Sequence, residues 1–198
     1  MEQKSPLCGY ILAGGKSLRF GSDKARALLH GQALISRIAA VLQRFCSSIV
    51  VVADEADKYA DLDLATLADA HPGYGPISGL ETALCHAGAS QWIMVIACDW
   101  AILPSEFLEP LVFAPRDAYG AIAYYDDRWQ PMPGLYHASI LPIIHSQMRV
   151  GEFALWRLLE SVSAQRVKMP TPEYRGLQIN TRLELDRLNA VDGDFRNG

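Results

Sequence analysis

The residues best suited to chemistry near the amino terminus lie in one short loop. Gly14 and Gly15 follow an apolar run and are succeeded by three cations, Lys16, Arg19 and Lys24. Small residues let backbone N–H groups approach a phosphate closely, and the cations add charge-assisted hydrogen bonds to its oxygens. This pattern predicts a loop that binds a phosphorylated ligand. The alternative is an ordinary turn with solvated cations.

Two familiar nucleotide-binding motifs are absent from this loop. The first glycine of a P-loop, GxxxxGK[ST], would have to stand where the sequence has Tyr10. The GxGxxG pattern is missing as well, which argues against a nicotinamide dinucleotide. The loop therefore predicts phosphate binding of another type.

Two more polar features follow apolar runs further along the chain. Asp99 comes directly after the run 92–98, where a carboxylate is a natural ligand for Mg²⁺. Its alternative role is a helix cap or a structural hydrogen-bond acceptor. The Gly/Pro-rich segment 71–79 could close over a flat base, or it could be an ordinary Ω-loop.

The elements that must position these features alternate between strands and helices. Continuous apolar, β-branched runs predict buried strands, and apolar spacings of three and four predict helices. The expected strands are 7–12, 48–53, 64–68 and 92–98, and the expected helices are 34–45, 80–87 with Ser78 as N-cap, and 105–112. In a parallel sheet, ligands bind beyond the carboxyl ends of the strands, so the three features should meet on one rim.

The second half of the chain has a different pattern. Segments 119–125 and 132–136 flank Asp126 to Arg128 and predict a hairpin or an antiparallel addition, followed by a helix over 151–162. An edge strand over 166–169 and a closing helix over 181–188 complete the prediction. The fold class is therefore α/β, with a mostly parallel central sheet flanked by helices and a small antiparallel element in the second half.

Composition narrows the class of protein. The chain has 198 residues, half of them hydrophobic, which suits a single domain over 1–198. Its net charge of −4 argues against a nucleic-acid or membrane partner, although the first 30 residues hold five basic residues against two acidic ones. No apolar run is long enough for a membrane span and no signal peptide is apparent, so we expect a cytoplasmic protein.

Several motifs, taken in order, resemble those of one family. They are Leu12–Gly15 with Arg19–Gly21 and Asp23–Lys24, then Asp69, Gly75–Gly79, Ala97–Asp99, Gln130–Pro131 with Leu135–Tyr136, and Ile179–Thr181. This series is similar to that of the molybdenum cofactor guanylyltransferase family of nucleotidyltransferases. The resemblance runs from residue 8 to residue 189. The first motif is specific, whereas the others are informative mainly through their order.

The resemblance implies a fold, a reaction and a set of site residues. The fold would be a Rossmann-like nucleotidyltransferase fold, with a nucleotide-binding half over 7–113, an acceptor-side half over 114–190 and a tail over 191–198. The reaction would be Mg²⁺-dependent transfer of a nucleotidyl group, GMP above all, from a nucleoside triphosphate to a molybdopterin-type phosphate, with release of pyrophosphate. The implied catalytic residues are Arg19, Lys24 and Asp99, with Asp99 also holding Mg²⁺. The implied nucleotide-binding residues are Leu12, Ala13, Gly14, Gly15, Lys24, Asp69, Gly75, Pro76, Gly79 and Asp99.

Departures from the family pattern concern the acceptor side. Asn180 and Trp100 are implied to lie there, but Trp100 stands where the family has methionine or threonine. Trp100 could stack on a pterin-like ring, although a core position is the favoured interpretation. The implied partners are GTP or another nucleoside triphosphate, a molybdopterin-type acceptor, and a molybdoenzyme or cofactor-delivery protein. The alternatives are a cytidylyl- or sugar-1-phosphate nucleotidyltransferase, and a non-catalytic nucleotide-binding module.

Overall fold

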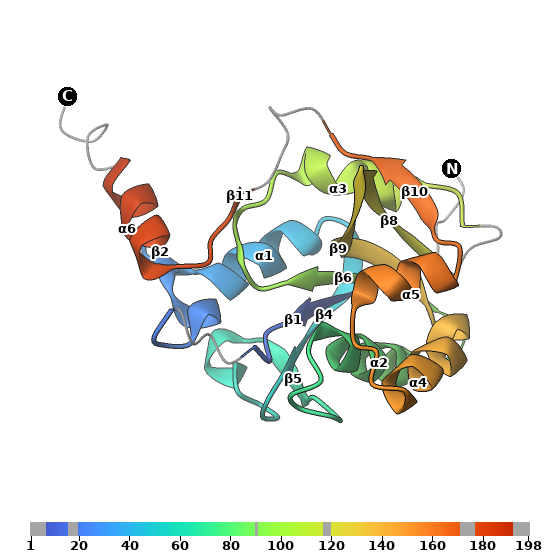
Figure 1. Ribbon diagram of the computed structural model, residues 1–198. Coiled ribbons are helices and arrows are strands. Elements are labelled where there is room, and N and C mark those ends of the chain that lie inside the picture. Colours follow the sequence, from blue (N-terminus) through green and yellow to red (C-terminus); the bar gives the residue numbers. More distant parts are fainter. Residues whose placement is uncertain (1–6, 16–19, 90, 117–119, 171–176, 192–198) are drawn as a thin grey trace.

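The computed structural model describes residues 7–15, 20–89, 91–116, 120–170 and 177–191, and a seven-stranded sheet forms its centre (Figure 1). The strand order is β10-β8-β9-β6-β1-β4-β5. The strands are β1 (Leu7–Leu12), β4 (Cys46–Ala53), β5 (Ala65–Ala68), β6 (Trp92–Ala97), β8 (Ala121–Asp126), β9 (Arg128–His137) and β10 (Gln165–Lys168).

The sheet is mostly parallel, with one antiparallel strand inserted in it. Strand β1 pairs in parallel with both β4 and β6, β4 pairs in parallel with β5, and β10 pairs in parallel with β8. Strand β9 is antiparallel to both β6 and β8. This arrangement confirms the predicted fold class, and it brings the carboxyl ends of β1, β4, β5 and β6 to one edge of the sheet.

Helices cover both faces of the sheet (Figure 1). On one face α1 (Leu34–Leu42) and α3 (Ser105–Val112) pack over Ile11, and on the other α2 (Pro76–Ala87), α4 (Leu141–Arg149) and α5 (Leu155–Ser161) pack over Tyr10 and Leu12. Successive residues of β1 thus face opposite layers, as the two-residue period of a strand requires. No helix in the described part of the chain is long and apolar enough to cross a membrane.

Short elements complete the fold and bring distant segments together. They are the antiparallel pair β2 (Leu28–Leu29) and β3 (Gln32–Ala33), the antiparallel pair β7 (Trp100–Ile102) and β11 (Leu177–Gln178), and the 3₁₀ turns η1 (Lys24–Arg26), η2 (Ala60–Leu62) and η3 (Ala138–Ile140). The β7–β11 pair holds the segment that leads to helix α6 (Arg182–Val191) beside the end of β6. A small third cluster of buried side chains, with Phe20, Leu34 and Leu185 among its members, anchors α6.

Some predicted boundaries differ from the structure. The helix expected to start at residue 80 begins at Pro76, because proline suits the first helical position and Gly75 takes the N-cap conformation. Helix α4 was not predicted; Ile144 is its one buried residue, so the helix contributes little to the core. Helix α6 continues to Val191, past the predicted end, and the rest of the predicted tail lies outside the described residues.

Candidate active site

The glycine loop follows the carboxyl end of β1 and lines a cavity of about 700 Å³. Strand β1 is held there by hydrogen bonds from the N–H of Ala13 to the Val52 carbonyl (2.8 Å) and from the N–H of Cys98 to the Leu12 carbonyl (3.1 Å). Leu12, Gly14 and Gly15 line the cavity, whereas Ala13 is buried in the core. Arg19 and Lys16 lie outside the described residues.

Asp69 organises the Gly/Pro loop, which forms another part of the wall of this first cavity. Its Oδ1 accepts hydrogen bonds from the N–H of His71 (3.1 Å), from the Thr82 hydroxyl (3.4 Å) and from the Ser78 hydroxyl. Ser78 therefore bonds to Asp69 inside α2 and is not the N-cap of that helix, as was predicted. The carboxylate ties the loop to the first turns of α2, and Asp69, Pro72 and Gly73 line the cavity.

Two glycines of this wall are required by backbone geometry. Gly75 has φ 75°, a conformation that side chains rarely adopt. A Cβ on Gly79 would lie 3.1 Å from Cδ2 of Leu12, so the absence of a side chain lets α2 approach the end of β1 closely. Gly75, Pro76 and Gly79 all line the first cavity. The structure thus brings seven of the ten predicted nucleotide-binding residues to one cavity: Leu12, Gly14, Gly15, Asp69, Gly75, Pro76 and Gly79.

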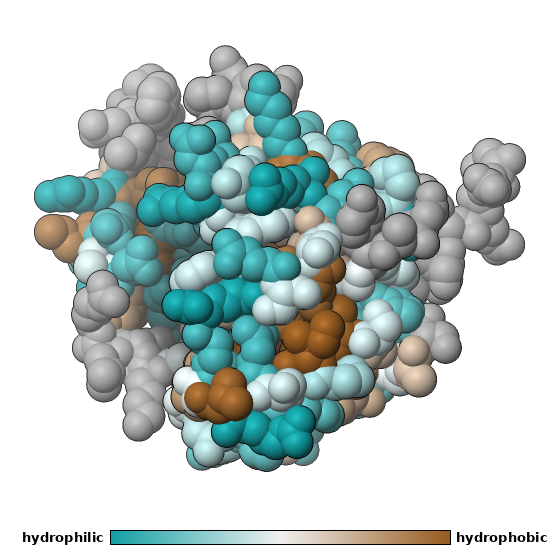
Figure 2. Space-filling model, turned by 45° about the vertical axis from the view of Figure 1, so that its right-hand side comes forward, coloured by the Kyte–Doolittle hydropathy of each residue, from teal (hydrophilic) through white to brown (hydrophobic). Residues whose placement is uncertain are grey.

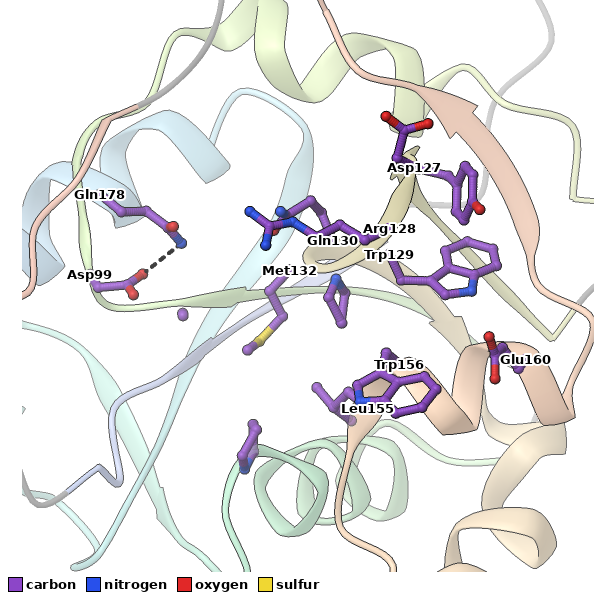
Figure 3. Close-up of a pocket in the computed structure, with 14 residues that line it drawn as sticks. Asp99, Asp127, Arg128, Trp129, Gln130, Met132, Leu155, Trp156, Glu160 and Gln178 are labelled. Carbon is purple, nitrogen blue, oxygen red and sulfur yellow. Dashed lines mark hydrogen bonds between the residues drawn. The ribbon is translucent and has the colours of Figure 1, made fainter.

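Lys24 and Asp99 are brought together by the segment that follows β11. Lys24 Nζ donates a hydrogen bond to the carbonyl of Ile179 (3.0 Å), whose N–H donates to the carbonyl of Asp99 (2.9 Å). Gln178 Nε2 donates to Oδ1 of Asp99 (3.3 Å; Figure 3). Burial raises the pKa of Asp99 above its usual value, while the nearby charge of Lys24 and the Gln178 hydrogen bond act in the opposite direction.

Asp23, which was not among the predicted site residues, caps the short turn that carries Lys24. Its Oδ1 accepts from the N–H of Ala25 and caps η1, and its Oδ2 accepts from the Tyr59 hydroxyl (2.9 Å). Lys58 Nζ lies 3.4 Å from the same carboxylate. Burial, and next the charge of Asp23, raise the pKa of Tyr59, so the phenol stays a hydrogen-bond donor. The sequence signal for this role was an aspartate one residue before a short helical turn.

A second cavity of about 620 Å³ adjoins the first and was not predicted as a site (Figure 3). Its wall comes from the β8–β9 hairpin, α5 and β11, and it includes Tyr125, Asp127, Arg128, Trp129, Gln130, Pro131, Met132, Leu155, Trp156, Glu160 and Gln178. In Figure 2 hydrophobic side chains gather in a recess of an otherwise largely hydrophilic face. Among these residues only Gln130 and Pro131 belong to the motifs that carry the family resemblance.

Aromatic side chains dominate the wall of the second cavity. Trp129 meets Tyr125 edge-on at 5.2 Å between ring centroids, and the Arg166 guanidinium lies 4.1 Å from the Tyr125 ring centroid. Trp156 is 44% exposed and has the Arg157 guanidinium 4.7 Å from its ring centroid. Cation–π contacts of this kind hold aromatic rings in place. The cavity therefore offers a flat, apolar wall with polar groups around it.

The two cavities share three lining residues, Pro76, Ala97 and Met132. Ala97 is the last residue of β6, and Asp99, two residues later, lines the second cavity. A ligand in the first cavity and a ligand in the second would consequently meet close to the Asp99 carboxylate. This junction is where a group could pass between two bound molecules.

The two residues expected on the acceptor side lie in different surroundings. Trp100 is 6% exposed, packs on Phe107 at 5.1 Å between centroids and lines neither of these cavities, in agreement with its interpretation as a core residue. Asn180 is exposed, and its N–H donates to Oε2 of Glu184 (2.6 Å). It directly follows Ile179, which is the residue that joins Lys24 to Asp99.

Comparison with known proteins identifies the fold and the family. Residues 9–167 match the model of the MobA-like NTP transferase domain. The chain belongs to this family. It is 39% identical over 149 residues to a protein of Deinococcus radiodurans, covering 74% of this chain and 76% of that one, and 33% identical over 192 residues to a protein of Chloroflexus aggregans, covering 94% and 90%. Both relatives are named "probable molybdenum cofactor guanylyltransferase".

Solved structures agree with this assignment. A protein of Aquifex aeolicus superposes with a TM-score of 0.75 at 26% identity, over 89% of this chain and 95% of that chain. A molybdopterin-guanine dinucleotide biosynthesis protein A from Archaeoglobus fulgidus gives a TM-score of 0.75 at 23% identity, over 95% and 100%, and shows the shared fold. The MobA-like chain is therefore a nucleotidyltransferase, and the predicted fold and family are confirmed.

Proposed function

We propose that this chain transfers GMP from GTP to the phosphate of a molybdopterin-type acceptor and releases pyrophosphate. The observation that carries the proposal is the pair of adjoining cavities that share Pro76, Ala97 and Met132 next to Asp99. The names of the relatives support both the nucleotide and the acceptor. In this proposal the half of the chain over 7–113 binds the nucleotide, and the half over 114–190 supplies most of the acceptor wall.

The first cavity takes the nucleoside in this account. Its glycines let the backbone approach a flat base, and Asp69 and Asp54 bring carboxylates into the lining. Hydrogen bonding to Lys58 lowers the pKa of Asp54 below its usual value, so that group stays an acceptor. Carboxylates suit the N–H donors of guanine or the hydroxyls of ribose. We propose that Leu12, Ala13, Gly14 and Gly15 lie beside the junction between the nucleoside and its triphosphate.

The phosphates would lie toward Lys24 and Asp99, with Arg19 as a further cation. Mg²⁺ fits this place, because it is usually held by one or two carboxylates together with substrate phosphates. No group of three or more acidic, histidine or cysteine side chains among the described residues could hold a metal by itself. Asp99 is partly buried and its pKa is raised by burial, so a cation would compensate its ionised form. When bound, Mg²⁺ would neutralise charge that develops on the transferred phosphate.

The second cavity takes the acceptor. Its aromatic wall suits a flat heterocycle, and Arg128 brings a cation into the lining for an anionic group. Asn180 would lie beside the reacting groups, because it directly follows Ile179, whose carbonyl accepts a hydrogen bond from Lys24. A phosphate oxygen of the acceptor is already anionic and can attack the α-phosphorus without a general base. The protein then contributes position and charge neutralisation, which account for most catalysis in phosphoryl transfer.

The test is an assay of pyrophosphate release with each nucleoside triphosphate, Mg²⁺ and molybdopterin. The proposal predicts that turnover requires the acceptor and is fastest with GTP. A faster reaction with CTP, or with a sugar 1-phosphate in place of molybdopterin, would contradict the corresponding assignment. Binding of GTP without turnover under any condition would favour a nucleotide-binding role, in which the chain serves a molybdoenzyme or a cofactor-delivery protein.

A further inference from the structure

The buried carboxylate of Glu81 lies between two histidines, one of which belongs to the Gly/Pro loop. Glu81 of α2 is 7% exposed. Its Oε1 lies 2.9 Å from Nε2 of His145 on α4, and its Oε2 lies 3.5 Å from Nε2 of His71 in the Gly/Pro loop. Within the described structure Oε2 is buried and makes no hydrogen bond of standard geometry. A carboxylate this buried needs donors or positive charge. The His145 ring meets Oε1 at hydrogen-bond distance, and the His71 ring lies within ion-pair distance of Oε2.

The three side chains come from three separate segments, and two of these, the Gly/Pro loop and α2, contribute residues to the wall of the first cavity. His71 belongs to the loop between β5 and α2, whose Pro72, Gly73 and Gly75 line the first cavity. The loop is tied at its start by Asp69, which accepts the N–H of His71. Glu81 gives the loop a second attachment through the side chain of His71.

A stack of rings extends this attachment toward the second cavity. The Tyr74 ring lies parallel to that of His71, with centroids 6.0 Å apart, and to that of Phe153, with centroids 4.9 Å apart. Phe153 precedes Leu155 and Trp156 by two and three residues, and both of these line the second cavity. The Gly/Pro loop thus packs, through Tyr74, on the segment that leads into the wall of the second cavity.

The Gly/Pro loop contains glycines whose backbone conformation the contacts of His71 and Tyr74 restrict. Gly73 and Gly75 have φ of 100° and 75°, and glycine populates many backbone conformations in an unanchored chain. A loop that is ordered only when ligand binds reduces affinity by its conformational entropy, whereas a pre-ordered loop does not. The attachments through His71 and Tyr74 therefore favour tight binding at this wall.

We infer that Glu81 is a positioning residue for nucleotide binding, acting through His71 to hold the 70–75 loop in its binding conformation. The inference rests on the proposed function, in which the first cavity holds the nucleoside triphosphate. Glu81 does not line either of the two adjoining cavities and does not touch the reacting groups. Its loss should therefore change affinity for the nucleotide and leave the chemical step nearly unaffected.

The test measures GTP affinity by calorimetry and steady-state rates for Glu81→Ala, His71→Ala and the double variant. Each single change should raise Kd and KM for GTP about 10-fold and leave kcat within about twofold. The double variant should be no worse than either single one, because both changes break the same contact. Glu81→Gln retains the size and one acceptor, and it should fall between the wild type and Glu81→Ala.

The matched control is Leu84→Ala, which removes a fully buried side chain from the same helix without altering the Glu81 or His71 side chain. It should lower Tm and leave Kd for GTP unchanged. Additive effects in the double variant, or an equal rise in Kd for Leu84→Ala, would overturn the inference. His71→Ala alters a half-exposed loop residue, so it keeps the test open if Glu81→Ala fails to fold. A wild-type Kd for His71→Ala would also overturn it.

Amide hydrogen exchange in the nucleotide-free protein separates this inference from the proposed function. Amides of residues 70–75 should exchange faster in Glu81→Ala and His71→Ala than in the wild type, and those of β1 should not. If the wild type binds no nucleoside triphosphate, the proposed function fails, and unchanged exchange in the loop would independently refute the role of Glu81.

Discussion

The two adjoining cavities are built in different ways. The first is formed largely by backbone and small residues after strands β1 and β5, including Gly14, Gly15 and Gly75. The second is formed by large side chains from a hairpin and a helix, including Trp129 and Trp156. Substitutions in the two cavities should therefore act differently. Those in the first cavity should act through backbone conformation and charge, and those in the second cavity through loss of contact area with the ligand.

The junction between the cavities should show the largest effect. Asp99→Ala should lower Mg²⁺-dependent turnover by about 10²- to 10³-fold, the scale seen when one charge-stabilising group is removed from a transition state. Affinity for GTP in the absence of Mg²⁺ should change little. Pyrophosphate release measured across a Mg²⁺ titration checks this, and a full rate in Asp99→Ala would show that the metal is held elsewhere.

Lys24, which is joined to Asp99 through Ile179, should show the next largest effect. Lys24→Ala removes an ammonium group held beside Asp99, and it should weaken GTP binding by about 10- to 100-fold, the range for a charged hydrogen bond. Guanosine should bind to the variant as it does to the wild type, because it lacks phosphates. The control is Arg149→Ala, which removes an exposed charge at the end of α4. Equal losses in both variants would mean that overall charge, and not Lys24, attracts the nucleotide.

Changes in the aromatic wall of the second cavity should weaken binding of the acceptor and not of the nucleotide. Trp156→Ala should raise KM for the acceptor about 10-fold, since stacking on one aromatic ring is worth about 1–3 kcal/mol, and should leave KM for GTP unchanged. Phe113→Ala is a matched control, because Phe113 is 64% exposed at the end of α3 and lines neither cavity. A rise in KM for GTP in Trp156→Ala would place the nucleotide in the second cavity.

The smallest effect concerns backbone conformation in the first cavity. Gly75→Ala forces a side chain onto φ 75° and should cost about 1 kcal/mol of stability, which lowers Tm by about 3 °C for a chain of this size. Gly15→Ala is the control, because Gly15 does not have a positive φ, and at both positions an added Cβ would meet no atom within 4 Å. Thermal unfolding of the two variants should differ, and equal Tm values would remove the strain argument.

The sequence predicted the first cavity well and the second hardly at all, for a physical reason. A loop after a strand is a contiguous motif, so the Gly14–Gly15 and Gly75–Gly79 segments could be recognised directly. The second cavity draws Trp129, Trp156 and Gln178 from three separate elements, and none of these residues is unusual where it stands in the sequence.

Side-chain direction was the other limit of sequence analysis. Trp100 follows Asp99 directly, yet its ring packs on Phe107 in the core. The roles of Asp23 and Glu81 depend on partners at least ten residues away, Tyr59 for the first and His71 and His145 for the second. Such partnerships become visible only when the fold brings the segments together.

The most direct test of the account is a crystal structure of the protein soaked with GTP and Mg²⁺. The account predicts guanine density between Leu12 and Asp69 in the first cavity, with the α-phosphate beside Asp99 and the second cavity free for the acceptor. Guanine stacked against Trp129 and Trp156, or a triphosphate remote from Asp99, would contradict it.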